Sequence, residues 1–309
     1  MGLILGVLLD LFIGDPEGFP HPVVLMGKII SLEEKFFRKI FKSETGLKFA
    51  GFLMIAINMF ISFFIPYKLL SILKAYKMFY SILNVYLIFT CIAARCLHKE
   101  GMKVYHGLNK GIEEGRYRLS FIVGRDTSSL NEEEIIKADV ETISENTADG
   151  VIAPIIYIII LGAPGGFLYK MVNTMDSMVA YKNEKYKDLG YFPAMVDDMF
   201  NYIPARITGI LMCLSSIFKY DVKNGFKIMW RDRKNHESPN ASYPEGAISG
   251  LLNIQLGGDN YYFGKLVKKP TIGDRIRSIE KEDIKRAIDI MYRTEMLLIL
   301  IYLILKNIK

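Results

Sequence analysis

Long apolar stretches alternate along this chain with polar stretches that are rich in lysine and arginine. The stretches Phe49–Ile65 and Met78–Ala94 are uninterrupted by charged side chains. Each approaches the roughly 20 apolar residues that a helix needs to cross a bilayer. The pattern therefore predicts membrane-spanning helices at about 49–66 and 78–95.

A third apolar region, 151–179, is interrupted in its middle. Val151–Leu161 is too short to cross a bilayer, and it is followed by G-A-P-G-G at Gly162–Gly166 and a second apolar piece, Phe167–Val179. Glycine and proline together break a helix, and broken helices at membrane depth are tolerated where they pack inside protein or line a cavity. We expect a re-entrant pair of half-helices that returns the chain to the side it left. One kinked span is the alternative.

Two further apolar helices complete the pattern, at 204–219 and 288–306. The sequence shows no internal repeat and no low-complexity linker. The expected fold is therefore an all-α, polytopic helical membrane protein with broken or re-entrant helices and cytoplasmic helical segments. We expect a single membrane-embedded domain over 1–309.

Composition supports a membrane protein with substantial polar segments. Apolar residues make up 51% of the 309 residues and charged residues 23%, and the mean hydropathy is +0.21. The net charge of +6 is better explained by basic residues at a membrane surface than by nucleic-acid binding. No basic stripe is interleaved with stacking aromatics, so we expect lipid and no nucleic acid as a partner.

The basic residues also predict which side of the membrane each polar segment occupies. The segments 27–48, 95–149 and 219–286 are rich in lysine and arginine, whereas 67–77 is short and poorer in them. The positive-inside rule places the three rich segments in the cytoplasm. A multi-pass protein of the cell membrane with its active site on the cytoplasmic side is the expected arrangement.

An acidic face precedes the interrupted apolar region. Glu141, Glu145 and Asp149 recur at a spacing of four residues, which puts them on one face of a helix. Stacked like charges destabilise an ordinary helix, so a cation is expected to offset them. A magnesium ion held by a few carboxylates and by substrate phosphates meets that need. The competing interpretation is a set of solvated helix ends beside a membrane segment.

A second group of polar residues follows that region. Asn173 and Asp176 share a helix face, and Asp198 lies near Asn201. Asp197 and Asp198 are adjacent and therefore point to different sides of a helix, so that one can face a site and the other water.

Known signatures of other chemistries are missing from the sequence. It contains no phosphate-binding P-loop, no dinucleotide-binding glycine fingerprint and no serine nucleophile elbow. The 3 cysteines and 4 histidines show no ligand spacing, so a transition-metal site is not expected. Carboxylates, carboxamides and a few arginines remain, and such a set suits a phosphorylated substrate with a divalent ion.

Several long motifs resemble one family. They are L-D-L-F-I-G-D-P and H-P-V-V-L-M-G within 9–27, G-R-D-T-S-S-L at 124–130, E-T-I-S-E-N-T-A-D-G-V-I-A-P from Glu141, G-A-P-G-G, Y-K-M-V-N-T-M-D-S-M-V, D-D-M-F-N-Y-I-P-A-R, S-P-N-A-S-Y-P-E at 238–245 and L-G-G at 256–258. In this order and over nearly the whole chain, they resemble the adenosylcobinamide-phosphate synthases of cobalamin biosynthesis, the CobD/CbiB type. Ser242-Tyr243 departs from the glycine and tryptophan that the family pattern has there.

The resemblance implies a substrate and a reaction. A propionate carboxylate of adenosylcobyric acid is joined in an amide bond to (R)-1-amino-2-propanol O-phosphate, or to free aminopropanol, and ATP is consumed. The resemblance leaves open whether ADP or AMP is released. It also leaves open oligomer formation and contact with other corrinoid-pathway enzymes.

The resemblance supplies motif positions, to which we assign roles as hypotheses. Binding of Mg²⁺ with ATP is assigned to Glu141, Glu145 and Asp149, and binding of a second ion or of the amine's ammonium group to Asp197 and Asp198. Phosphate binding is assigned to Arg125 and Arg206. The orientation of carboxylate or amide oxygens is assigned to Asn146, Asn173 and Asn240. Asp176 is a further catalytic candidate, and Asn201 and Glu245 are further substrate-binding candidates. Asn146 and Asp149 have a structural alternative as caps of the following half-helix.

Two other classes of protein remain open from the residues alone. A magnesium-dependent intramembrane prenyltransferase also places acidic helices on a diphosphate, but it usually has paired acidic arrays facing each other. A transporter also uses broken helices with acids at mid-depth, but commonly shows a repeated half.

Overall fold

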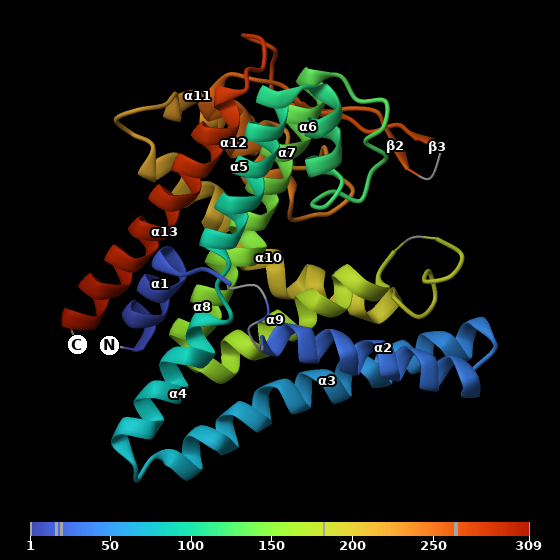
Figure 1. Cartoon of the computed structure of the whole chain (residues 1–309), viewed down its shortest axis with the longest axis vertical. Coiled ribbons are helices and arrows are strands. Elements are labelled where there is room, and N and C mark those ends of the chain that lie inside the picture. Colours follow the sequence, from blue (N-terminus) through green and yellow to red (C-terminus); the bar gives the residue numbers. More distant parts are fainter. Residues whose placement is uncertain (1, 16–17, 19–20, 182, 263–264, 309) are drawn as a thin grey trace. The chain divides into compact units, whose positions relative to one another are not determined.

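Helices dominate the computed structural model, which describes residues 2–15, 18, 21–181, 183–262 and 265–308 (Figure 1). The helices are α1 (Gly2–Phe12), α2 (Pro22–Ile40), α3 (Glu44–Leu73), α4 (Lys77–Phe89), α5 (Ala94–Lys110), α6 (Ile112–Leu119), α7 (Glu132–Asn146), the π-helix η1 (Thr147–Ile152), α8 (Ala153–Leu161), α9 (Ala163–Val179), α10 (Tyr191–Ser215), α11 (Val222–Arg231), α12 (Ser242–Leu252) and α13 (Glu282–Ile308). The strands are β1 (Leu256–Gly257), β2 (Asn260–Tyr262), β3 (Lys265–Val267) and β4 (Thr271–Ile272). The prediction of an all-α helical membrane protein is confirmed, apart from these four short strands.

The chain folds into two compact units, each built from two separate stretches of sequence. Unit 1 comprises Met1–Ala93 and Ala153–Asn201, and unit 2 comprises Ala94–Ile152 and Tyr202–Lys309. The single domain expected over 1–309 stays a prediction.

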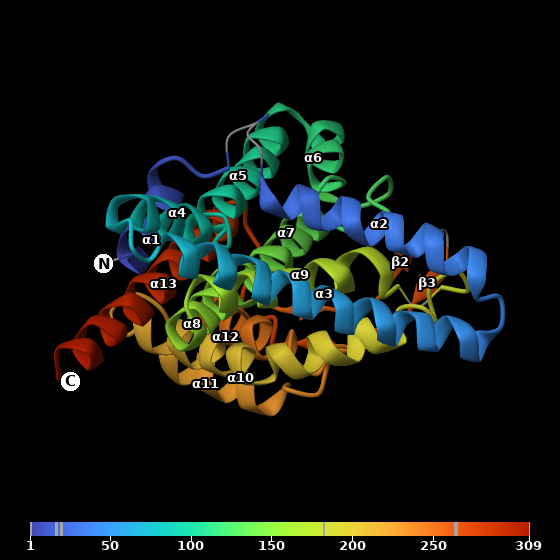
Figure 2. The same ribbon diagram turned by 90° about the horizontal axis from the view of Figure 1, so that it is seen from below.

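Unit 1 is a set of packed helices around α9. α9 lies along α3 and also contacts α2 and α4, and α1 packs against α4. Figures 1 and 2 both show α2, α3 and α9 running side by side. α3 approaches the connection before α10 so closely that a Cβ on Gly51 would lie 2.1 Å from the carbonyl oxygen of Leu189.

The interrupted apolar region forms a helical hairpin inside unit 1. Gly162 has a φ of 73°, which a side chain would disfavour, and the chain reverses there so that α8 and α9 pack together. A Cβ on Gly165 would lie 2.5 Å from the carbonyl oxygen of Tyr157, so glycine is required where the two helices meet. The expected reversal at G-A-P-G-G is therefore present.

One part of that expectation is wrong. The run Val151–Leu161 is not an isolated half-helix, because η1 joins α7 to α8 and the helical run extends from Glu132 to Leu161 over 30 residues. The π-helical turn inserts into the helix without ending it, as such turns frequently do near functional sites.

By length and composition, three segments among the described residues are of membrane-spanning size. They are Glu44–Leu73, Lys77–Lys110 and Glu132–Leu161. The second of them comprises α4 and α5, with the non-helical residues 90–93 between the two helices. The spans expected at 204–219 and 288–306 are not among them. α13 carries charged residues through its first half, from Glu282 to Glu295, so only its last turns are continuously apolar.

Unit 2 is centred on α7. This helix contacts α5, α6, α12 and α13, and Figure 1 shows it beside α5 and α6. It begins with a capping box, in which Asn131 and Glu134 each accept a hydrogen bond from the other's backbone N–H. α11 and α12 pack closely because Gly246 and Gly250 face α11, where Cβ atoms would lie 2.9 Å from the Cα of Met229 and 2.4 Å from the carbonyl oxygen of Asn224.

The strands that the structure describes, β1 to β4, lie in unit 2 and form two antiparallel pairs. β1 pairs with β4, with Leu256 opposite Ile272, and β2 pairs with β3, with Tyr261 opposite Leu266. Gly257 and Gly258 between β1 and β2 have positive φ values of 70° and 88°. Glycine allows this sharp change of direction, and the L-G-G motif therefore shapes a loop rather than a helix.

The proline-rich run Gly14–Pro22 lies partly outside the described residues. Within the described part, His21 is the N-cap of α2, and its Nδ1 accepts a hydrogen bond from the backbone N–H of Val23 at 3.3 Å. Pro22 occupies the first helical position, where its missing N–H costs nothing.

Candidate active site

A polar pocket of about 270 Å³ lies within unit 2. The loop before α7, α7 itself, the start of α12 and the loops around the strands supply its wall. The lining residues are Ile122, Val123, Gly124, Arg125, Glu141, Thr142, Glu145, Asn146, Asn235, His236, Glu245, Gly257, Asn260, Lys269 and Pro270. Five of the predicted site residues thus meet here: Arg125, Glu141, Glu145, Asn146 and Glu245.

Glu141 joins two of the sequence motifs through both of its carboxylate oxygens. Oε2 accepts a hydrogen bond from Arg125 Nη2 at 2.6 Å, and Oε1 accepts one from the backbone N–H of Gly257 at 2.7 Å. Arg125 also donates to Asn260 Oδ1 at 3.1 Å. Glu141 is only 5% exposed, so this ion pair is largely shielded from water. Its geometry holds the G-R-D-T turn and the L-G-G loop against α7.

Glu245 is the most deeply buried acid of the pocket. It is 3% exposed and lies in the first turn of α12, where the helix dipole favours a negative charge. Its Oε1 lies 3.9 Å from Nε2 of His236. Burial raises the pKa of Glu245 well above its usual range, and the charges of Glu141 and Glu145 raise it further, while Arg125 and Lys269 act in the opposite direction.

The ring of His236 is oriented by its own loop. Its Nδ1 accepts a hydrogen bond from the backbone N–H of Ser238 at 3.0 Å. In the neutral ring the proton is therefore on Nε2, the atom nearest to Glu245. The neutral ring of His236 thus points a hydrogen-bond donor, its Nε2–H, toward the pocket.

The magnesium triad expected from the spacing is not assembled. Glu141 and Glu145 line the pocket, but Asp149 lies on η1 and is not among the lining residues. Within residues 2–15, 18, 21–181, 183–262 and 265–308, no three His, Cys, Asp or Glu side chains are grouped so as to hold a metal ion. Both oxygens of Glu141 are already engaged. The side chains therefore do not fit a magnesium ion held by these three acids.

Arg206 and Asn240 form a separate pair in unit 2. The guanidinium of Arg206 lies 3.5 Å from the ring centroid of Tyr202 and 4.3 Å from that of Tyr243, and Nη1 donates to Asn240 Oδ1 at 3.2 Å. Cation–π contacts of this kind hold a guanidinium in one plane. Tyr243 thus forms one wall around Arg206.

The Asp197–Asp198 motif lies in unit 1, where a buried hydrogen-bonded chain fixes one of the two acids. Asn201 donates through Nδ2 to Asp197 Oδ2 at 3.0 Å and accepts from the hydroxyl of Tyr169 at 2.7 Å. Asp197 is 7% exposed, whereas Asp198 is half-buried. The two adjacent acids therefore differ in burial, and the prediction that one faces a site and the other water stays a prediction.

The remaining predicted residues of unit 1 lie on α9. Asn173 and Asp176 are both half-buried, one turn apart, on the helix that packs against α3 and α8. Asn173, Asp176, Asp197, Asp198 and Asn201 thus belong to unit 1, and the pocket residues belong to unit 2.

His236, Asn260 and Lys269 are among the pocket residues that reasoning from the sequence missed. His236 stands two residues before the S-P-N-A-S-Y-P-E motif, and Asn260 follows the L-G-G motif. Their position next to a motif was the one feature of the sequence that could have indicated His236 and Asn260 as site residues. Lys269 enters the wall because β2 and β3 turn the chain back, which the sequence pattern does not indicate.

Comparison with known proteins identifies the family. The family model described as CobD/Cbib protein matches residues 3–291. A cobalamin biosynthesis protein CobD of Clostridium tetani is 55% identical over 302 residues, which cover 97% of this chain and 95% of that protein. Proteins of the same name from Clostridium acetobutylicum and Geobacter metallireducens are 48% and 42% identical; each match covers 99% of this chain, and 98% and 96% of those proteins. No solved structure matches the chain. With nearly the whole chain matched, and with the motif residues Arg125, Glu141 and Glu245 gathered in one pocket, this protein belongs to the CobD/CbiB family of cobalamin biosynthesis enzymes.

Proposed function

We propose that the protein forms an amide bond between a propionate carboxylate of adenosylcobyric acid and the amino group of (R)-1-amino-2-propanol or its O-phosphate, with ATP as the energy source. The observation that carries this proposal is the pocket of unit 2, in which the buried carboxylate of Glu245 faces a small space bordered by Glu145, Arg125 and Lys269. Such a wall offers opposite charges to a small amine and to phosphate oxygens, as an amide-forming ligase requires.

The chemistry requires an activated carboxylate. An amine cannot displace oxide from a carboxylate at neutral pH, so a better leaving group must be attached first. A carboxylate oxygen attacks the γ-phosphorus of ATP, ADP leaves, and an acyl phosphate results. The amine nitrogen then attacks the acyl carbon, phosphate leaves, and the nitrogen gives up its proton to a base. Activation through an acyl adenylate, with loss of pyrophosphate, is the alternative.

Charged and carboxamide side chains have the remaining proposed roles. Arg206, held between Tyr202 and Tyr243, is suited to bind phosphate oxygens with its guanidinium edge. Asn173 and Asn240 are proposed to orient carboxylate or amide oxygens. Magnesium is proposed to enter as the ATP complex, in which the phosphates supply most of its ligands.

Turnover by the purified protein tests this proposal. The detergent-solubilised protein is incubated with ATP, Mg²⁺, adenosylcobyric acid and the amine, and the corrinoid product is identified by its mass. We expect one amide bond and one nucleoside product per turnover, with ADP or AMP distinguishing the two activated forms. Prenyl transfer to an acceptor, or uptake of a solute into vesicles with no chemical change, would replace this proposal with one of the two other classes.

Of the two acids in the Asp197–Asp198 motif, we expect Asp197 to serve the reaction. Asp197→Asn should lower turnover by about 100-fold, the loss typical when one charge-stabilising group is removed from an active site. Asp198→Asn is the matched control, because it makes the same change at the half-buried neighbour, and it should retain most activity. Both variants should unfold at the wild-type temperature. Near-normal turnover by Asp197→Asn would show that the motif is structural.

We propose that the protein spans the cell membrane several times, with its active site in the cytoplasm. α8 and α9 reverse the chain at Gly162, so Glu132 and Glu184 are expected on one side. Single cysteines at Glu132 and Glu184, in an otherwise cysteine-free protein, should resist an impermeant thiol reagent in intact cells and react in inside-out vesicles. Tyr76→Cys, in the connection with few basic residues, is the control that should react from outside. Labelling of Glu184→Cys alone from outside would contradict this topology.

A further inference from the structure

The pocket of unit 2 is too small for most of the proposed reactants. Its volume is about 270 Å³, below the roughly 300–1,000 Å³ of pockets that enclose drug-sized ligands. A corrinoid is several times larger than such a cavity, and the adenosine part of ATP would also fill most of it. The aminoalkanol is the one proposed reactant that fits inside as a whole.

The charges in the wall favour a cation. The pocket is lined by three carboxylates, Glu141, Glu145 and Glu245, and by two basic side chains, Arg125 and Lys269. Arg125 and Glu141 are paired with each other at 2.6 Å, so their charges largely cancel. Of the other three, two are acids and one is a cation, so with both acids ionised the wall carries one negative charge more than it carries positive charges.

Glu245 in particular has no close ion-pair partner among the described residues. Its carboxylate is 3% exposed and lines the pocket, and the nearest basic side-chain atom paired with it is His236 Nε2 at 3.9 Å, beyond hydrogen-bonding distance. A buried carboxylate without a hydrogen-bond donor is costly, so a donor brought by a ligand is favoured here. Since no three acids of the described chain are grouped for a metal ion, a primary ammonium group fits this wall better than a divalent cation.

We infer that this pocket is the subsite for the amine substrate, with its ammonium group held against Glu145 and Glu245. This inference rests on the proposed function. Lys269, a cation in the same wall, is then the proposed partner of the ligand's hydroxyl or phosphate ester. The corrinoid carboxylate and ATP approach from outside the pocket, and the amine is presented to them in a fixed orientation. The same ammonium chemistry is available from a free aminoalkanol or from an ethanolamine lipid headgroup, and we assign it to the free molecule.

Binding without turnover tests this subsite. The full-length protein is placed in nanodiscs of phosphatidylcholine and phosphatidylglycerol and titrated calorimetrically with (R)-1-amino-2-propanol, with its O-phosphate, and with propane-1,2-diol, which replaces the ammonium by a hydroxyl. We expect the amine, with or without phosphate, to bind at least about tenfold more tightly than the diol, since hydrogen bonds between charged groups are the stronger ones. Equal binding of amine and diol would overturn the inference.

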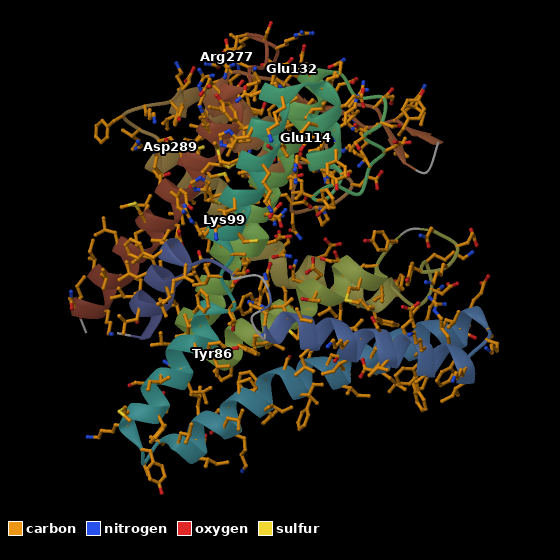
Figure 3. All side chains as sticks on the ribbon, viewed as in Figure 1. Tyr86, Lys99, Glu114, Glu132, Arg277 and Asp289 are labelled. Atoms are coloured by element: carbon orange, nitrogen blue, oxygen red, sulfur yellow. The ribbon has the colours of Figure 1, made fainter. Side chains whose placement is uncertain are left out.

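Matched substitutions locate the binding. Glu245→Gln should weaken amine binding by about tenfold or more. Glu145→Gln should do the same, and it provides a second test if the Glu245 variant fails to fold, because Glu145 is half-exposed. Glu132→Gln removes an exposed acid from the start of the same helix, labelled in Figure 3, and should leave the affinity unchanged. Unchanged affinity in both pocket variants would overturn the assignment.

Two further experiments distinguish a soluble amine from a lipid headgroup or a metal ion as the ligand. Together with the turnover assay, they also distinguish failure of the subsite from failure of the proposed function. Adding phosphatidylethanolamine to the nanodiscs should not alter the affinity for the soluble amine, whereas competition would reassign the pocket to a lipid headgroup. Mg²⁺ alone should not compete with the amine, and competition that depends on Glu245 would reassign the pocket to a metal ion. Amide formation with no effect of Glu245→Gln on amine binding would refute the subsite and leave the function standing. Tight, Glu245-dependent amine binding without amide formation would do the reverse.

Discussion

The Arg277→Met variant should lose about 3–5 kcal/mol of unfolding free energy, the usual result when one partner of a buried ion pair is removed. Asp283 is fully buried at the start of α13 and accepts hydrogen bonds from both terminal nitrogens of Arg277. Arg277 also donates to the carbonyl oxygen of Leu252 at 2.9 Å, which ties the end of α12 to this point. Methionine keeps much of the side-chain volume, but it cannot donate the two hydrogen bonds that the buried carboxylate of Asp283 accepts from Arg277. Denaturant unfolding of the solubilised protein measures the loss.

Arg275→Met is the matched control. Arg275 stands two residues earlier and pairs with Glu133, but both side chains are exposed, 61% and 43%. Exposed pairs contribute about 0–1 kcal/mol, so this variant should unfold almost as the wild type does. Figure 3 labels Arg277 among the side chains of this part of unit 2. Equal losses in the two variants would mean that the buried network around Asp283 does not stabilise the fold.

The ion pair between Arg277 and Asp283 contributes to the stability of the fold in a way that depends on pH. Burial raises the pKa of Asp283, but hydrogen bonds from Arg277, from the backbone N–H of Glu280 and from Arg286 outweigh it, and the pKa lies below its usual range. A carboxyl whose pKa is lowered in the folded state stabilises it fully above its unfolded pKa of about 4. That contribution is lost as the pH falls through the folded-state pKa. The difference between wild type and Arg277→Met should therefore shrink below about pH 4.

The apolar pattern predicted the helices better than their connections. Phe49–Ile65 lies inside α3, because an unbroken apolar stretch leaves the backbone few other solutions in a bilayer. Most of Met78–Ala94 lies inside α4, but the helix ends at Phe89, and the apolar pattern did not predict that break. The join between α7 and α8 was not predictable in this way. Gly150 suggests a break, yet a π-helical turn carries the helix through it. The sequence did not predict the strands, because each strand has only two or three residues, too few to show an alternating pattern.

The site was predictable as a set of motifs but not as a set of contacts. Arg125, Glu141, Glu145, Asn146 and Glu245 were all identified from motifs that stand far apart in the sequence, and the fold of unit 2 brings them to one pocket. Helical spacing alone also grouped Asp149 with them. Spacing shows which residues share a face, but not which of their oxygens are already engaged. The pairing of Glu141 with Arg125 and Gly257 depends on two loops whose paths only the structure gives.

That pairing leads to the other large effect we expect. Glu141→Ala should destabilise the protein by about 3–5 kcal/mol, because it removes one partner of a largely buried ion pair. It also leaves the backbone N–H of Gly257 without its acceptor. The G-R-D-T turn and the L-G-G loop should then separate from α7, and turnover should fall with the loss of the pocket wall. Denaturant unfolding in the absence of Mg²⁺ and ATP measures the stability, and Glu133→Ala, at an exposed pair on the same helix, should cost less than about 1 kcal/mol.

The Glu141→Gln variant distinguishes two roles for Glu141, as a residue that positions the two loops or as a magnesium ligand. Glutamine keeps an oxygen for the N–H of Gly257 but removes the charge opposite Arg125. If Glu141 positions the two loops, the variant should be destabilised without Mg²⁺, and the Mg²⁺ concentration that gives half-maximal turnover should not change. If Glu141 holds the metal, stability without Mg²⁺ should be nearly normal, and more Mg²⁺ should restore turnover. Because both oxygens of Glu141 are engaged by Arg125 and Gly257, we expect the first result, and rescue by Mg²⁺ would return Glu141 to the metal site that its helical spacing suggests.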